Sequence, residues 1–217
     1  MRVLLTGATG MVGQGVLREC LLAPDVTEVV SLGRSPLPTD DPKLTSIVVA
    51  DLFDLSDVDG FARIDACFFC LGLSSTGVTP ETYERVTHDL TIAVADALAA
   101  RSPDPTFIYV TGAGTSETSR MRWARVKGRT ERELLERFPK AYMFRPGFIQ
   151  PLHGIESRTR FYRLVYSAVG FVVPLLRRIA PNQIVSTEEV GRAMLTVARG
   201  GAPKHIITNA DIAALAR

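Results

Sequence analysis

The chain has 217 residues, which is enough for one sizeable α/β domain and short for two. Hydrophobic residues make up 46% and charged residues 22%, an ordinary globular composition that excludes an intrinsically disordered chain. A formal net charge of +2, without a dense basic run, argues against a nucleic-acid-binding surface.

Residues 1–24 predict a strand, a glycine turn and a helix in that order. Residues 2–6 form a short apolar run typical of a buried strand, and residues 14–22 repeat apolar side chains at helical spacing. Between them, a Gly-x-x-Gly-x-x-Gly pattern allows a sharp turn and lets a pyrophosphate approach bare backbone at the helix N-terminus. The alternative is a packed strand–helix corner without a ligand. The residues that we predict to hold the pyrophosphate are Gly7, Thr9, Gly10, Met11, Val12 and Gly13.

The second predicted strand, residues 27–32, is followed by Arg34. At this place in a dinucleotide-binding fold, an acid hydrogen-bonds the adenosine 2′-hydroxyl, whereas an arginine pairs with a 2′-phosphate. No Asp or Glu ends this strand, so the sequence favours NADP over NAD. The alternative is that Arg34 is a solvated surface cation beside the proline-rich loop over residues 36–42.

Strands and helices alternate along the rest of the chain, which predicts a doubly wound, mostly parallel sheet in a single α/β domain over residues 1–217. No internal repeat and no low-complexity linker divides the chain. Thr187 is expected to cap the helix over residues 187–199. The other strands are predicted over residues 44–50, 66–72, 106–111, 141–144, 184–186 and 205–208, and the other helices over residues 55–62, 80–100 and 120–138.

A small variable segment, residues 153–182, is expected as a C-terminal helical lobe on the substrate side. Its apolar part, residues 161–179, contains three arginines and Pro174, whereas a membrane-spanning helix needs about twenty nearly uncharged residues. We therefore expect one or two helices at the outer edge and no transmembrane segment. The alternative is an interfacial or partner-binding patch. The shortness of the segment indicates a small, apolar or absent substrate.

The cysteines and the start of the chain bear on its location. Met1 leads directly into the first strand, which leaves no room for a signal peptide. Cys67 and Cys70 are three residues apart in a predicted strand, so their side chains are expected on opposite faces. Three buried, reduced thiols fit a cytoplasmic protein.

Together, these motifs make the sequence similar to the atypical short-chain dehydrogenase/reductase family, in its NmrA-like and Tat-interacting-protein-like branch. This family is related to the NAD-dependent epimerase/dehydratase proteins. The resemblance runs over nearly the whole chain and implies a Rossmann fold with NADP(H), or NAD, lying across the carboxyl ends of the strands. The motifs that carry it are Thr6–Gly13, Gly33 with Arg34, Phe68–Gly72, Val126–Gly128 with Glu131, and Phe144–Gly147.

The resemblance also implies contacts along the cofactor. Asp51 would reach the adenine amino group and Leu52 would pack on the ring, although Asp51 is equally suited to capping the next turn. The other expected contacts are Leu71, Gly72 and Leu73 at the ribose and diphosphate, Lys127 at the nicotinamide ribose, and Pro146, Gly147 and Phe148 at the nicotinamide end.

Catalytic members of the family carry Tyr-x-x-x-Lys on the helix after the fifth strand, with the tyrosine as general acid. The matching residues here are Trp123 and Lys127, and an indole N–H donates a hydrogen bond but does not titrate usefully. Thr111 stands where catalytic members carry a serine. Lys127 is alternatively a surface residue paired with Glu131 one turn later.

Several other side chains are candidates for the missing proton donor or for the supporting hydroxyl. Thr87 takes the place of an asparagine that is frequent in the family, and no metal-ligand spacing is visible. Lone histidines are more often structural than catalytic. The candidates are Tyr83, Tyr109, Tyr142, Tyr162, Tyr166, Thr115, Ser116, His88 and His153.

The sequence therefore predicts an NADP(H)-binding protein of the short-chain dehydrogenase/reductase type with weak or unusual oxidoreductase activity. One alternative is a non-catalytic NADP(H)-sensing regulator or protein-interaction module, and another is an epimerase- or dehydratase-like enzyme with a displaced acid. The glycine spacing and Arg34 disfavour a scaffold without a cofactor. We expect a monomer or homodimer without a metal, whose partners are the dinucleotide and either a protein or a small apolar substrate.

Overall fold

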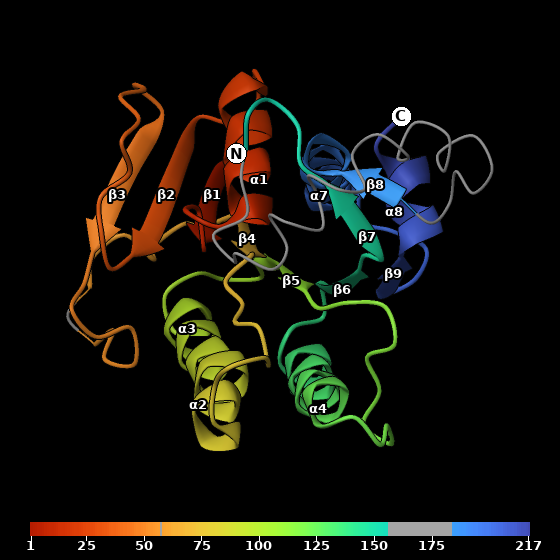
Figure 1. Cartoon of the computed structure of the whole chain (residues 1–217). Helices are drawn as coiled ribbons and strands as arrows, with labels where there is room; N and C mark the ends of the chain where they lie inside the picture. Colours follow the sequence, from red (N-terminus) through yellow and green to blue (C-terminus); the bar gives the residue numbers. More distant parts are fainter. Residues whose placement is uncertain (57, 156–183) are drawn as a thin grey trace.

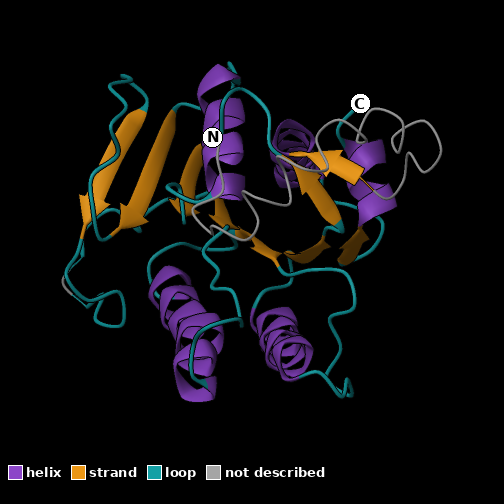
Figure 2. Cartoon of the chain, viewed as in Figure 1, coloured by secondary structure: helices purple, strands orange, loops and turns teal. Residues whose placement is uncertain are grey.

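The computed structural model describes residues 1–56, 58–155 and 184–217, and its centre is a seven-stranded, all-parallel sheet (Figures 1 and 2). The strand order β3-β2-β1-β4-β5-β6-β9 reverses direction at β1, which is the pattern of a doubly wound fold. The predicted fold class is confirmed. The strands are β1 (Arg2–Thr6), β2 (Glu28–Gly33), β3 (Leu44–Val48), β4 (Ala66–Phe69), β5 (Thr106–Val110), β6 (Ala141–Arg145) and β9 (Ile206–Thr208).

Helices cover both faces of this sheet, as Figure 1 shows. On one face lie α1 (Met11–Leu22), α7 (Thr187–Gly200) and α8 (Asn209–Leu215). On the other face lie α4 (Arg122–Arg137) and the continuous run of α2 (Pro80–Glu84), the π-helical turn η1 (Arg85–Asp89) and α3 (Leu90–Ala99).

Helices cover both faces of the sheet, so the strands are buried on both sides. Neighbouring side chains of a strand point to opposite faces and therefore enter different cores. Val3 and Leu5 on β1 belong to the core cluster under α1 and α7. Leu4, between them, belongs to the second cluster, under α3 and α4. A continuous apolar strand therefore supplies two cores, which explains why β1 shows no alternation of polar and apolar residues.

The helix expected over residues 55–62 is wrong, because the described part of this stretch consists of turns. The Arg101 guanidinium donates to the Leu55 carbonyl at 3.0 Å and also to the Ser56 carbonyl. Those two carbonyls would otherwise accept the first bonds of a helix. Gly60, with a φ of +115°, adds a backbone conformation that a helix cannot contain.

The C-terminal part differs from the expectation in three details. Ser186, not Thr187, caps α7: its hydroxyl accepts from the Glu189 amide at 3.1 Å, and the Glu189 carboxylate accepts from the Ser186 amide at 2.6 Å. The strand β8 (Ile184–Ser186) pairs with β7 (Phe148–Gln150) in a separate two-stranded parallel sheet. Neither β7 nor α8 was expected from the sequence.

The three thiols are free, and Cys67 and Cys70 pack on opposite faces of the sheet as expected. Burial raises the pKa of Cys20 to about 12, so it stays protonated.

The stretch of residues 161–179, with Tyr162 and Tyr166, lies outside the described residues. Among the helices that the structure describes, none is both long and apolar enough to cross a membrane.

Candidate functional site

The glycine turn between β1 and α1 is closed by backbone-to-backbone contacts. Gly7 has a φ of +73°, and the Gly10 amide donates to its carbonyl oxygen at 2.9 Å. A Cβ on Gly7 would lie 2.6 Å from the Leu71 amide nitrogen, and one on Gly13 would lie 2.1 Å from the Gly7 oxygen. Side chains at Gly7 and Gly13 are therefore excluded by the chain itself, where β1, α1 and the exit of β4 meet.

Gly10 faces a different environment. It caps α1 without a side-chain hydrogen bond from the described residues, and a Cβ there would meet only the Gly7 oxygen, at 3.2 Å. The first turn of α1, which begins with Met11 and Val12, contains no acidic residue, so nothing on the helix offsets its positive end. Gln14 is tied back to the turn, because its side-chain amide donates to the Thr9 carbonyl at 3.2 Å. This open, uncapped turn fits a pyrophosphate.

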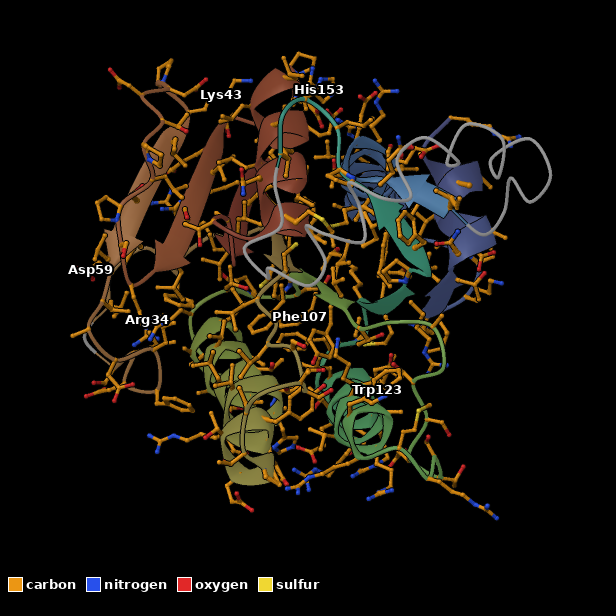
Figure 3. The ribbon with its side chains drawn as sticks, in the orientation of Figure 1. Arg34, Lys43, Asp59, Phe107, Trp123 and His153 are labelled. Atoms are coloured by element: carbon orange, nitrogen blue, oxygen red, sulfur yellow. The ribbon has the colours of Figure 1, made fainter. Side chains whose placement is uncertain are left out.

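Arg34 lies just beyond β2, at the carboxyl edge of the sheet (Figure 3). Its side chain is exposed and makes no hydrogen bond or ion pair with the part of the chain that the structure describes. Asp51 is also exposed, and its carboxylate accepts from the Phe53 amide at 2.9 Å, which is the turn-capping role. Leu52 is buried in the core under α3. Gly72 lies beyond the end of β4, and a Cβ added to it would meet no atom of the described residues within 4 Å.

Lys127 and Trp123 both face the loop that follows β5. The Lys127 ammonium donates to the Thr111 carbonyl at 2.7 Å, and burial lowers the pKa of Lys127 to about 8, although the Glu131 charge opposes this shift. Trp123 lies in the first turn of α4 (Figure 3), and a Cβ on Gly114 would lie 3.8 Å from its indole ring. The lysine and the indole therefore both lie beside residues 111–114, which follow β5.

Glu131 is paired with Arg145 and not with Lys127, so the surface ion-pair alternative for Lys127 does not hold. The Arg145 Nε donates to Glu131 Oε1 at 3.0 Å, and its Nη2 bonds to Oε2. The Thr111 hydroxyl donates to the same Oε1 at 2.7 Å. Since a hydroxyl has one proton, Thr111 Oγ1 is directed at Glu131 in this structure.

The backbone of the segment after β6 is held by two hydrogen bonds. The Pro146 carbonyl accepts from the Ala113 amide at 2.9 Å, and the Gly147 amide donates to Asn209 Oδ1 at 2.8 Å. Phe148 follows as the first residue of β7. The contribution of Asn209 was missed, because nothing in the sequence indicated that α8 begins beside this segment.

The other hydroxyl candidates are engaged in local bonds. Thr115 Oγ1 donates to the Gly112 carbonyl at 2.8 Å, and Ser116 bonds to the Thr118 hydroxyl at 3.1 Å. Thr87 lies in η1, where its carbonyl accepts from the Tyr109 hydroxyl at 3.2 Å. The Thr87 hydroxyl itself is buried without a partner among the described residues.

No described tyrosine takes the place of the missing acid. Burial raises the pKa of both Tyr83 and Tyr109, and Tyr142 packs in the core on the opposite face of the sheet from α4. His88 and His153 are paired with carboxylates, the latter with Glu188 at 2.8 Å. The described residues include no cluster that would hold a metal.

The described residues line two cavities outside the glycine turn. One of about 580 Å³ is bounded by residues 115–118, α4 and the ends of β6 and β9, with Glu131 and Arg145 in its lining. The other, of about 380 Å³, lies along α1 next to His153. Neither is lined by residues of the glycine turn, Gly7 to Gly13.

Residues 3–119, more than half of the chain, match the NAD dependent epimerase/dehydratase family. The protein FMP52 of Eremothecium gossypii is 31% identical over 151 residues, which cover 69% of this chain and 66% of the relative. FMP52 of Saccharomyces cerevisiae is 29% identical over 166 residues, 74% of this chain and 69% of the relative. This chain thus spans just under two thirds of the first relative's length. Both relatives are named as mitochondrial proteins, so the expectation of a cytoplasmic protein is wrong.

Among solved structures, MoeE5 in complex with UDP-glucose and NAD shares the fold, with a TM-score of 0.65 and 19% identity. The match covers 96% of this chain and 75% of that chain.

Proposed function

The chain belongs to the NAD dependent epimerase/dehydratase family, and from this premise we propose that it binds NADP(H) and has slow oxidoreductase activity. The observation that supports the proposal is the turn at Gly10, where the positive end of α1 has no capping side chain among the described residues. Lys127 supports the nicotinamide end, because its ammonium is held beside the carboxyl end of β5. When bound, the nicotinamide supplies or accepts a hydride.

The slow rate follows from Trp123. A phenol at this position would pass a proton to the substrate, whereas an indole N–H only donates a hydrogen bond. The loss of a general acid costs about 10²–10⁴-fold in rate, which leaves turnover measurable but low. The same residue favours a second candidate function, an NADP(H)-sensing regulator that binds the cofactor without turnover.

Native mass spectrometry of the purified protein, followed by titration with NADPH and NADH, tests the proposal. We expect copurified or added NADPH to bind as a stoichiometric complex, and NADH to bind more weakly. If neither nucleotide binds at millimolar concentration, the proposal is wrong. Binding without detectable oxidation of NADPH across a panel of aldehydes and ketones would favour the regulator.

Arg34→Ala is expected to weaken NADPH binding by about tenfold or more and to leave NADH binding unchanged, because a charge-assisted bond contributes about 1.5–3 kcal/mol. Isothermal titration with both nucleotides measures the two effects. Arg137→Ala is the matched control, because this arginine ends α4, away from the strand ends, and pairs with exposed Asp96. An equal loss for NADPH and NADH would exclude a 2′-phosphate contact for Arg34.

The affinity for NADPH is expected to fall as the pH rises above about 8, where Lys127 loses its proton. The sign follows from linkage: a ligand that prefers the ammonium binds best below the pKa, and its affinity falls by up to about tenfold per pH unit above it. Fluorescence titration of NADPH across this range measures the profile. Lys127→Met should bind weakly at every pH, and a variant that keeps the wild-type profile would assign the titration to another group.

A further inference from the structure

We propose that Glu131 is a positioning residue, which sets the place of the Lys127 ammonium by fastening the carboxyl ends of β5 and β6 to α4. The inference rests on the proposed function, in which Lys127 supports the bound nucleotide. Glu131 itself does not face the glycine turn, so it acts through the residues that it holds.

The geometry of the carboxylate is the first argument. The Glu131 side chain is 3% exposed, and both of its oxygens are engaged. Oε1 accepts from the Thr111 hydroxyl at 2.7 Å and from Arg145 Nε at 3.0 Å, while Oε2 accepts from Arg145 Nη2. One side chain on α4 therefore joins the residue after β5 to the last residue of β6.

The second argument is what Thr111 does with its carbonyl. That oxygen accepts a hydrogen bond from the Lys127 ammonium at 2.7 Å, so the direction of the Thr111 carbonyl decides where the positive charge lies. Two groups of Thr111 hold the residue in place before this carbonyl: its amide donates to the Phe144 carbonyl at 2.8 Å, and its hydroxyl donates to Glu131 Oε1 at 2.7 Å, with the Phe144 carbonyl as the more distant acceptor at 3.2 Å. Loss of the Glu131 carboxylate would remove the nearer acceptor of the hydroxyl and leave only the Phe144 carbonyl at 3.2 Å, which does not tie Thr111 to α4.

The third argument compares Glu131 with its neighbours on α4. Glu136 is 63% exposed and pairs with Arg132 at 3.0 Å, a surface contact of the kind that contributes little to stability. The Glu131–Arg145 pair is far more buried, and an apolar pair of similar volume would stabilise the fold about as well. An apolar pair would not orient the Thr111 peptide, so positioning explains the charged residues better than stability does.

The charges that face Lys127 determine the expected pH effect. From α4, the charge of Glu131 favours the ammonium. At the end of β6, Arg145 is a like charge that is paired with Glu131, and the residue after β5 contributes the neutral Thr111 carbonyl. Glu131→Gln removes the favourable charge and leaves Arg145 uncompensated. Both changes lower the pKa of Lys127.

Competitive acetylation of the nucleotide-free protein, read at Lys127 by mass spectrometry across a pH series, tests this directly. We expect the Lys127 midpoint in Glu131→Gln to fall by about one pH unit, with about twofold weaker NADPH binding at neutral pH and about tenfold weaker binding at about pH 9, above both midpoints. Glu136→Gln is the matched control and should change neither value. A Glu131→Gln variant with the wild-type midpoint and the wild-type NADPH pH profile would overturn the proposal.

A second variant covers the case in which Glu131→Gln does not fold because Arg145 is left unpaired. Glu131→Met with Arg145→Met removes both charges and also the side-chain acceptor for the Thr111 hydroxyl, and it is expected to fold. Its Lys127 should be acetylated faster than in the wild type at alkaline pH, since the Thr111 carbonyl no longer holds it firmly. A labelling profile that superimposes on the wild type would contradict positioning. Failure of the wild type to bind either nucleotide would overturn only the proposed function, because acetylation requires no nucleotide.

Discussion

Trp123→Tyr is expected to raise the rate of NADPH oxidation with a carbonyl substrate by about 10²–10⁴-fold, which is the usual contribution of a general acid. The new phenol would lie one helical turn before Lys127, whose ammonium is held at the Thr111 carbonyl and favours a nearby phenolate. The Trp123 ring packs beside Gly114 in the loop that follows β5 and is only partly buried, so a smaller ring is accommodated. The measurement is the steady-state loss of NADPH absorbance across a panel of aldehydes and ketones.

Trp123→Phe provides the control, because it makes the same reduction in volume without adding a hydroxyl. We expect no gain from Trp123→Phe, and we expect the gain of Trp123→Tyr to disappear when Lys127→Met is added. If Trp123→Tyr binds NADPH normally and still shows no turnover, the pocket lacks catalytic shape and the sensing function is the better proposal.

Gly13→Ala is expected to lower the free energy of unfolding by about 2 kcal/mol and to abolish nucleotide binding. A Cβ at this position would lie 2.1 Å from the Gly7 carbonyl oxygen, and the neighbour is backbone that no change of rotamer relieves. The gain in helix propensity from glycine to alanine, about 1 kcal/mol, is too small to offset this overlap. Thermal and urea unfolding measure the loss, which corresponds to a melting temperature lower by about 4–8 °C.

Gly10→Ala separates the fold from the ligand in the same turn. Its Cβ would contact only the Gly7 oxygen, at 3.2 Å, so we expect a stability change below about 1 kcal/mol. The methyl group would stand at the first turn of α1, where we propose that the pyrophosphate lies, and NADPH affinity should fall by about tenfold. Normal NADPH binding by Gly10→Ala would show that no pyrophosphate lies against this turn.

Local signals were sufficient for most of the fold. The apolar run, the glycine spacing and the helical repeat over residues 2–22 each report on neighbours in the chain, and the structure shows β1, the turn and α1 in that order. The expected helix over residues 55–62 failed for the opposite reason. Its carbonyls are bound by Arg101, which lies 46 residues from Leu55, and no local pattern carries such a contact.

The candidate site divides in the same way. The sequence identified Trp123, Lys127 and Arg34 as residues of interest, and the structure places Arg34 at the carboxyl edge of the sheet and the other two at the loop after β5. The sequence did not identify Asn209, whose side chain accepts a hydrogen bond from the Gly147 amide. The two residues are far apart in the chain, and only the folded sheet brings α8 next to Gly147. The pairing of β7 with β8 was unpredictable for the same reason.

The sequence by itself determined the doubly wound architecture and the bare turn at the start of the chain, since both follow from periodicity and from the absence of side chains at fixed spacing. Only the tertiary structure decided which cationic side chain pairs with the Glu131 carboxylate. Glu131 is four positions from Lys127 and fourteen from Arg145, yet it pairs with Arg145. Spacing along a helix limits which groups can meet, but the packing of α4 against β6 determines which guanidinium or ammonium reaches a buried carboxylate.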